Sequence, residues 1–329
     1  MRLFAAIVIR LSSAFVPSES ANYKMGSSMT ISSNAIDAPS VGSLLQRAQQ
    51  IREKMYGCNQ SLPPFILDSS AHELSYPSST YVMGADVSGT ARRNRNSEKV
   101  QRGYCNWLVP QTIMIGQYPN TTPESYGPSS RECQLHIQNM VKDANISLFC
   151  CLQTEVPSQV DDIGWKGGEV YLEPDSVRRE FPRPFTRYGP LAQSFTDTQL
   201  TFLHNPIEDL SIPTCNENLL SLLSQLLQHL ESDDKETTIY LHCWGGRGRA
   251  GLIGSCLASL LFPELTSKEV LDWVQRGYDT RLGAKHMRDG LKRSPQTEQQ
   301  RWFVREFVTL VHAEKVERWT HEKIRLSKE

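Results

Sequence analysis

The chain has 329 residues, of which 39% are hydrophobic and 22% are charged, so it can bury a sizeable core in one or two domains. Its 35 basic and 36 acidic side chains give a formal net charge of −1, which does not indicate a nucleic acid or an anionic membrane as an obligate partner. No apolar run approaches the roughly 20 residues that a membrane-spanning helix needs. Recognition of an anion must therefore depend on a local cluster of charge.

Eight cysteines are scattered widely along the chain. None belongs to a C-x-x-C pair, and no group of cysteines and histidines has the spacing of a zinc site. We therefore expect mostly free thiols in a reducing compartment, and neither a metal nor another cofactor.

The first 45 residues are expected to be a targeting or disordered segment. A basic start, a short apolar stretch and small residues before Phe15 lead into S-S-A-F-V-P, although Arg10 interrupts the apolar stretch. This motif resembles the cleavage site of the bipartite presequences that direct proteins to the secondary plastids of some algae. The alternative is a disordered tail on a cytoplasmic protein, with translation starting at Met25.

Residues 46–103 have a polar, linker-like composition, with one helix expected from about Ser43 to Met55. A folded domain is expected over 104–313 and a charged tail over 314–329. Short apolar or β-rich runs predict buried strands at 111–116, 146–152, 200–204 and 237–242. Apolar residues at helical spacing predict helices at 130–144, 217–231 and 249–261, and two more that begin after Thr266 and near Thr297.

Two capping boxes are expected at helix starts, one from Thr214 and Glu217 and one from Thr266 and Glu269.

Strands that alternate with helices predict an α/β fold with a largely parallel central sheet flanked by helices. Ligand sites in such sheets lie beyond the carboxyl ends of the strands. The long connection over 153–199 is either an insertion without a role or a segment that shapes substrate entry.

The residues from 239 to 251 read I-Y-L-H-C-W-G-G-R-G-R-A-G, with an expected strand end at His242 and an expected helix start near Arg249. Glycines in such a loop let successive backbone N–H groups converge on one anion, and the helix N-terminus adds partial positive charge. The guanidinium of Arg249 can bind two phosphate oxygens. The same positive field favours a thiolate, so Cys243 is expected to be an ionised nucleophile rather than a buried structural cysteine.

The segment H-C-W-G-G-R-G-R at 242–249 resembles the H-C-x5-R signature of cysteine-dependent protein tyrosine and dual-specificity phosphatases. N-P-I-E-D-L-S-I-P at 205–213 resembles the acid loop of the small members, especially the cyclin-dependent-kinase-associated type. S-P-Q-T-E-Q-Q-R-W-F-V at 294–304 resembles the Q-T-x-x-Q glutamine loop, and residues 106–119 look like the first strand of these domains. The resemblance covers about residues 104–313 and implies a protein tyrosine phosphatase-like fold.

The resemblance implies hydrolysis of phosphate monoesters on proteins, with phosphotyrosine as substrate and phosphoserine or phosphothreonine as further candidates. Cys243 would form a cysteinyl-phosphate, and Arg249 would hold the phosphate oxygens. Asp209 would protonate the leaving oxygen; the alternatives are that Glu208 is the acid or that Asp209 is a solvated turn residue. The residues implied in substrate binding are Trp244, Gly245, Gly246, Arg247 and Gly248.

His242 is expected to support the loop through hydrogen bonds. Gln296 and Gln300 either orient the hydrolytic water or simply form a polar helix start. Arg247 is either solvated or faces the cleft, where it would favour substrates with more than one phosphate, including phosphoinositides. Ala250 departs from the Ser or Thr of many family members, whose hydroxyl helps the thiolate to leave, so slower breakdown of the intermediate is expected.

Three other functions remain alternatives. The first is a phosphatase for phosphoinositides or for another non-protein phosphate monoester, such as a phosphorylated glucan. The second is a phospho-binding protein with little turnover, which Ala250 alone favours. The third is a sulfurtransferase, which needs neither Asp209 nor the glutamine segment. The sequence leaves the oligomeric state open, and the expected partner is a phosphorylated protein substrate.

Overall fold

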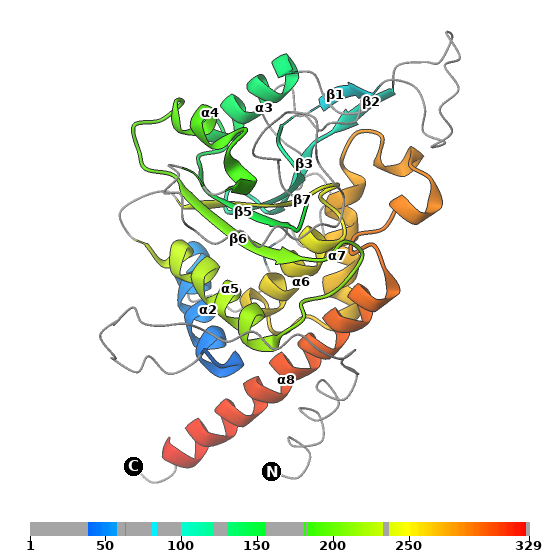
Figure 1. Ribbon diagram of the computed structural model, residues 1–329. Helices are drawn as coiled ribbons and strands as arrows, with labels where there is room; N and C mark the ends of the chain where they lie inside the picture. Colours follow the sequence, from blue (N-terminus) through cyan, green and yellow to red (C-terminus); the bar gives the residue numbers. More distant parts are fainter. Residues whose placement is uncertain are drawn as a thin grey trace, which may run out of the picture. The chain divides into compact units, whose positions relative to one another are not determined.

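The structure is a computed structural model that describes residues 39–57, 63, 80–83, 100–120, 130–155, 181, 183–232 and 237–326. These residues form a mixed α/β arrangement in which a central sheet lies between two groups of helices (Figure 1). The expected fold class is confirmed. None of the described helices combines the length and the apolar character that a membrane span requires.

The central sheet has the strand order β3–β4–β7–β5–β6. Its strands are β3 (Cys105–Val109), β4 (Ile113–Gln117), β5 (Ile146–Gln153), β6 (Thr201–Ile207) and β7 (Thr238–Cys243). β7 pairs in parallel with both β4 and β5, β6 pairs in parallel with β5, and β3 closes one edge in antiparallel pairing. The four predicted strands and the largely parallel sheet are confirmed. A separate antiparallel pair consists of β1 (Thr80–Met83) and β2 (Val100–Gly103).

Each face of the sheet has its own apolar core, because successive side chains of a strand point to opposite faces. On β7, Leu241 and Cys243 belong to one cluster while Tyr240 belongs to the other. The larger cluster includes residues of α5 (Asn216–Glu231), α6 (Arg249–Leu261), α7 (Ser267–Asp279) and α8 (Glu298–Leu326). The smaller one includes residues of α3 (Ser130–Lys142) and α4 (Gly189–Gln193), which follows a 3-10 turn, η3 (Arg183–Phe185).

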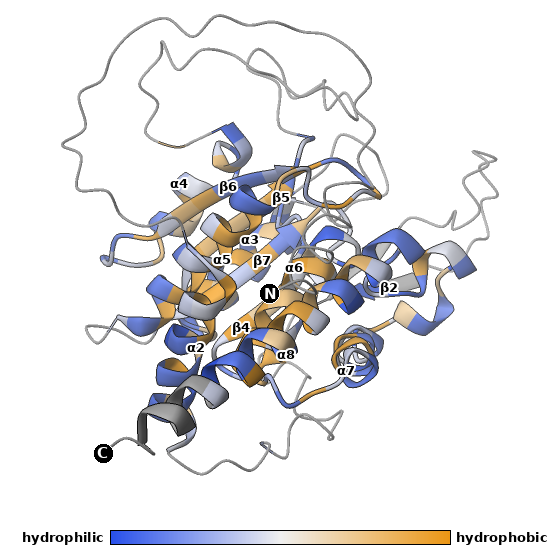
Figure 2. Cartoon of the chain, turned by 90° about the horizontal axis from the view of Figure 1, so that it is seen from below, coloured by the Kyte–Doolittle hydropathy of each residue, from blue (hydrophilic) through white to orange (hydrophobic). Residues whose placement is uncertain are grey.

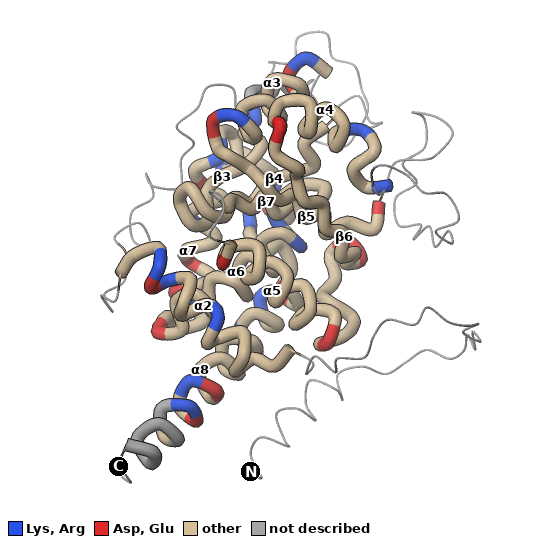
Figure 3. Tube along the Cα trace, turned by 90° about the vertical axis from the view of Figure 1, so that its left-hand side faces the viewer, with Lys and Arg blue, Asp and Glu red and all other residues tan. Residues whose placement is uncertain are grey.

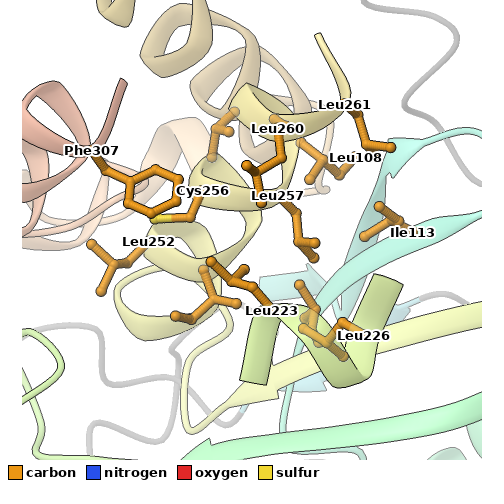
Figure 4. Packing of buried hydrophobic residues seen from close by; sticks show 14 of the residues in the cluster. Leu108, Ile113, Leu223, Leu226, Leu252, Cys256, Leu257, Leu260, Leu261 and Phe307 are labelled. Atoms are coloured by element: carbon orange, nitrogen blue, oxygen red, sulfur yellow. The ribbon is translucent and has the colours of Figure 1, made fainter. Parts of the chain in front are cut away.

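The helix that follows the site, α6, is buried along its whole length. Figure 2 shows it as largely hydrophobic, and Figure 4 shows how Leu252, Cys256 and Leu257 of α6 face Leu223 of α5 and Phe307 of α8. Surrounding helices and strands therefore leave this helix little freedom to move. A helix held in this way fixes the position of its first residue, Arg249.

The expected helix at 43–55 is confirmed as α2 (Val41–Tyr56). Although α2 precedes the expected start of the domain, it packs into the larger cluster. Its four buried side chains there are Leu44, Leu45, Ala48 and Ile51. Arg52 forms an ion pair with Glu264 at 2.7 Å, and Arg47 donates to the Ser224 hydroxyl at 3.1 Å. Of the expected targeting segment, residues 1–38 lie outside the described residues, so that segment stays a prediction.

α8 continues through residues 314–326, which the sequence assigns to a charged tail. Acidic and basic residues follow one another over the first part of this stretch, at Glu314, Lys315, Glu317 and Arg318 (Figure 3). Arg318 donates to the carbonyl oxygen of Gly42 at 2.6 Å, which ties this part of α8 to the start of α2.

One predicted helix cap is confirmed and the other is wrong. Thr266 and Glu269 form the expected capping box of α7. α5 begins at Asn216, so Cys215 is its N-cap and Thr214 lies one residue too early to cap it. Glu217 instead accepts a hydrogen bond from the Cys215 thiol at 2.7 Å. The helix is held mainly by its buried leucines, which explains why it does without a side-chain cap.

Two histidines in the described part of the chain are fully buried, His136 on α3 and His242 on β7, and His136 is the simpler one in which to test what burial costs the fold. Its ring stacks on Tyr104 with centroids 3.9 Å apart, and neither ring nitrogen has a hydrogen-bond partner among the described residues. Burial lowers the pKa of His136 to about 3. Between that value and the ordinary pKa near 6.5, the unfolded chain binds a proton that the folded chain does not.

Stability should therefore be lost as the pH falls below 6.5. A His136→Phe variant should show a shallower loss, by about 1.4 kcal/mol per pH unit, because it lacks this proton uptake on unfolding. Urea unfolding of both proteins between pH 6.5 and 4.5 measures the difference. Parallel pH profiles of the two proteins would show that His136 is not held neutral in the fold.

Candidate active site

The candidate site is the loop between β7 and α6. Cys243 is the last residue of β7 rather than the first residue after it, and α6 begins at Arg249 as expected. The five residues between them include half-buried Trp244 and Gly245 and buried Gly248. Cys243 is 3% exposed and lies at the carboxyl end of the central strand, where ligand sites of α/β sheets occur.

Gly246 shapes the loop through both its conformation and its lack of a side chain. Its φ of +64 lies in the left-handed region, which favours glycine. A Cβ on this residue would lie 2.1 Å from the carbonyl carbon of Gly116 on β4. The loop thus rests directly on the backbone of the neighbouring strand, and only glycine allows this approach.

Arg249 is 1% exposed and lies among carboxylates. Its Nη1 and Nη2 donate to the two carboxylate oxygens of Glu155 at 2.6 and 3.0 Å, and Nη1 also donates to the carbonyl oxygen of Ile207 at 3.1 Å. Asp209 Oδ1 lies 3.0 Å from Nη2. Both terminal nitrogens therefore face anionic oxygens at the site.

The charges of this cluster stabilise one another. Burial by itself would lower the pKa of Arg249, but the nearby Cys243, Glu155 and Asp209 together raise it. Burial would raise the pKa of Glu155, yet its hydrogen bonds and charge interaction with Arg249 lower it overall. The pair is thus an ionised, two-pronged ion pair inside the protein.

Asp209 belongs to the loop after β6, and its side chain is 60% exposed. The next residue, Leu210, has a φ of +61, and the N–H of Ser211 donates to the carbonyl oxygen of Glu208 at 3.1 Å. This tight turn directs the Asp209 carboxylate to Arg249. Glu208, the alternative acid, is exposed.

The two glutamines lie beside the loop, and their polar atoms bind protein groups. Gln300 is fully buried; its Oε1 accepts from the N–H groups of Gln296 and Thr297 at 3.1 Å each. Its Nε2 donates to the carbonyl oxygen of Ser211 at 2.9 Å. Gln300 thus binds the N–H groups at the start of α8 and connects this end of the helix to the acid loop.

Arg247 is half-buried. Its Nε donates to Gln296 Oε1 at 3.2 Å, and its guanidinium packs against Gly245, where a Cβ would lie 3.0 Å from Nη1. It lines a small pocket of about 30 Å³ beside the loop, together with Arg102 and Arg281. The guanidinium therefore lies along the rim of the site.

His242 points to the opposite face of β7 from Cys243. It is fully buried, and its Nε2 lies 2.6 Å from the hydroxyl oxygen of Tyr188. Burial, with smaller contributions from His204 and Arg249, lowers its pKa to about 3, so the ring is neutral. A neutral, anchored imidazole holds the end of the strand that carries the thiol.

Sequence reasoning missed the roles of Glu155 and Tyr188, which both come from the connection over 153–199. Within it, 156–180 and residue 182 lie outside the described residues. One signal for Glu155 exists, because it follows the carboxyl end of a predicted strand. The loop between β7 and α6 that begins after Cys243, here called the thiol loop, lies at the same end of the sheet. Tyr188 has no such signal. Among the described residues, no group of three or more His, Cys, Asp or Glu could hold a metal ion.

Residues 185–304 match the family model described as Swiss Army Knife protein, DSP-PTPase phosphatase domain. This segment is similar to a phosphatase domain. It contains the thiol loop, the acid loop and the glutamine segment, while Glu155 lies before it. The match does not single out the cyclin-dependent-kinase-associated type. No curated protein matches the chain.

Solved structures with similarity to this chain have low sequence identity. Tk-PTP in its active form is 17% identical, over 63% of this chain and 97% of that chain, with a TM-score of 0.38. PTPMT1 in complex with PI(5)P is 11% identical, over 64% and 99% of the two chains, with a TM-score of 0.38. The Trypanosoma cruzi protein tyrosine phosphatase TcPTP1 is 13% identical, over 80% and 90%, with a TM-score of 0.37.

Proposed function

We propose that the protein is a cysteine-dependent phosphatase that hydrolyses phosphate monoesters on proteins, phosphotyrosine above all. The observation that carries this proposal is the convergence of three groups at one edge of the sheet. Cys243 ends the central strand, Arg249 opens the following helix, and Asp209 lies 3.0 Å from Arg249. The match of residues 185–304 to a phosphatase domain supports the same class of reaction.

The reaction has two steps. In the first, the Cys243 sulfur attacks phosphorus, the bond from phosphorus to the leaving oxygen breaks, and Asp209 gives that oxygen its proton. In the second, a water attacks the cysteinyl-phosphate, Asp209 takes a proton from the water, and the sulfur–phosphorus bond breaks. Arg249 and the N–H groups of the loop hold the three equatorial oxygens in both steps.

The ion pair between Arg249 and Asp209 suggests how substrate and acid exchange places. A phosphate brings its own negative oxygens to Nη2 of Arg249, where Asp209 Oδ1 lies at 3.0 Å in this structure. The Asp209 carboxyl is then released toward the leaving oxygen. Glu155 remains bound to Nη1 and Nη2 and keeps the guanidinium in place.

The identity of the acid is tested by replacing Asp209 and its neighbour Glu208 in separate variants. Asp209→Asn is expected to lower kcat on a phosphotyrosine peptide by about 10²- to 10⁴-fold, the usual contribution of a positioned acid. The loss should be smaller on p-nitrophenyl phosphate, because nitrophenolate leaves without a proton. Glu208→Gln is the matched control and should retain kcat within about twofold. The reverse pattern, with Glu208→Gln inactive, would assign the acid to Glu208.

A second candidate is a phosphatase for substrates with two phosphates, such as phosphoinositides. The pocket beside the loop favours it, because Arg102, Arg247 and Arg281 all line it. The Nε of Arg102 is buried and has no hydrogen-bond partner among the described residues, although Nη1 donates to Gly283. Hydrolysis of doubly phosphorylated inositol lipids, with none of phosphopeptides, would favour this candidate over the first.

A further inference from the structure

Hydrogen-bond donors outside the loop hold three of its carbonyl groups. The Tyr118 N–H donates to the carbonyl oxygen of Trp244 at 3.2 Å. Arg281 Nη2 donates to that of Gly246 at 2.8 Å, and the Ser294 hydroxyl donates to that of Arg247 at 2.9 Å. The C=O and N–H of a trans peptide point in opposite directions. The N–H groups that follow these carbonyls, at residues 245, 247 and 248, therefore point away from the donors.

Ser294 makes the most specific of these contacts. It is 1% exposed, and its own N–H donates to Oε1 of Gln275 on α7 at 2.9 Å, which fixes the residue beside the loop. Its hydroxyl also lies against the first turn of α6, since a Cβ on Gly251 would be only 2.3 Å from the Ser294 oxygen. The absence of a side chain at Gly251 leaves the space that this hydroxyl occupies.

Arg281 makes broader contacts. Its Nε donates to Asn106 Oδ1 at 2.7 Å, and its Nη2 donates to the Ile115 carbonyl at 2.8 Å as well as to Gly246. It thereby joins β3, β4 and the loop, so its removal would disturb the sheet edge together with the site. The Ser294 hydroxyl donates to the loop and otherwise lies against the first turn of α6, so it is the better probe of loop orientation.

We infer that Ser294 is a positioning residue, whose hydroxyl fixes the peptide between Arg247 and Gly248 and so aims the Gly248 N–H at the bound phosphate. This inference rests on the proposed function, since it assumes that the loop binds phosphate. Without the hydroxyl, the Arg247 carbonyl loses its donor and the peptide is free to rotate. An N–H group that is not held in place contributes less to anion binding and to stabilisation of the transition state.

The test measures binding of inorganic phosphate by calorimetry, together with the kcat and KM for p-nitrophenyl phosphate. Ser294→Ala is expected to raise the Kd for phosphate about tenfold, the upper range for one hydrogen bond, with a matching loss in kcat/KM. Ser294→Thr keeps the hydroxyl and should restore both. Ser259→Ala is the matched control, because this buried α6 hydroxyl donates to the Cys256 carbonyl at 2.8 Å, within the helix.

Gly251→Ala provides an independent route to the same hydroxyl. Alanine has a higher helix propensity than glycine, so α6 should be no less helical in this variant. The added Cβ must nevertheless displace the Ser294 hydroxyl. We expect the same loss of phosphate affinity as in Ser294→Ala. The double variant should lose no more than either single variant, since both remove one hydrogen bond.

Unchanged phosphate affinity in Ser294→Ala, or losses that multiply in the double variant, would overturn the inference. If Ser294→Ala fails to fold, Gly251→Ala decides, and unchanged phosphate affinity in that variant would overturn the inference. A wild-type protein that neither binds phosphate nor hydrolyses p-nitrophenyl phosphate would instead remove the proposed function, so the two failures can be told apart.

Discussion

Replacing Cys243 with serine is expected to lower hydrolysis of phosphate monoesters by on the order of 10⁴-fold or more. A serine hydroxyl in the same place is a far weaker nucleophile, because it is not ionised at neutral pH. Phosphate affinity should persist, since Arg249 and the N–H groups of the loop remain. Steady-state rates on p-nitrophenyl phosphate, with phosphate binding measured in parallel, separate the two effects.

Cys215→Ser is the matched control for this substitution. Cys215 is the N-cap of α5, and serine is a favoured residue at that position, so activity and folding should both be retained. Equal activity of the wild type and the Cys243→Ser protein would contradict the mechanism. Wild-type binding of phosphate without turnover would favour the phospho-binding alternative, in which Ala250 is significant because it offers no hydroxyl to the departing thiolate.

Removing the Glu155 carboxylate should have the largest effect on stability. Glu155→Ala is expected to lower the free energy of unfolding by about 3–5 kcal/mol, because it leaves Arg249 buried without its main counter-charge. The substitution should also lower kcat/KM, since the guanidinium loses the partner that orients it. Urea unfolding near pH 7 measures the first effect, and the rate on a phosphotyrosine peptide measures the second.

The sign of the pH dependence follows from the lowered pKa of Glu155. Its contribution to stability is present above the ordinary carboxyl pKa and is lost as the pH falls through the folded-state pKa. Glu231→Gln is the matched control, because Glu231 forms a more exposed ion pair with Arg47 at 2.9 Å. That pair should contribute at most about 1 kcal/mol. Equal destabilisation by the two substitutions would show that burial of the Glu155–Arg249 pair adds nothing.

The central sheet and the thiol loop could be predicted from sequence because their signals are local. Apolar runs mark the strands, and the spacing from Cys243 to Arg249 falls between a strand pattern and a helix pattern. The cap of α5 could not be predicted as reliably. The helix begins one residue later than the expected capping box requires, so Cys215 rather than Thr214 is its N-cap. Buried leucines determine where that helix lies.

The ion pair between Arg249 and Glu155 could not be predicted because it depends on tertiary structure. Glu155 is separated from Arg249 by 94 positions in the sequence, and nothing in the local pattern of either residue specifies the pair. For Gln300 the sequence leaves two roles open, orientation of a water and a polar helix start. Which groups its amide contacts depends on the fold, which brings it to the carbonyl oxygen of Ser211 and to the N–H groups at the start of α8.

The contact between Gly246 and Gly116 has a consequence for how this protein can diversify. Because backbone meets backbone there, a side chain at Gly246 would force the loop or β4 to move. If the loop binds phosphate as proposed, a change of substrate preference is expected at the rim, where Arg247 is half-buried and Leu210 is 49% exposed beside Asp209. Selectivity and phosphate binding would then depend on separate parts of the loop region, and one could change while the other is kept.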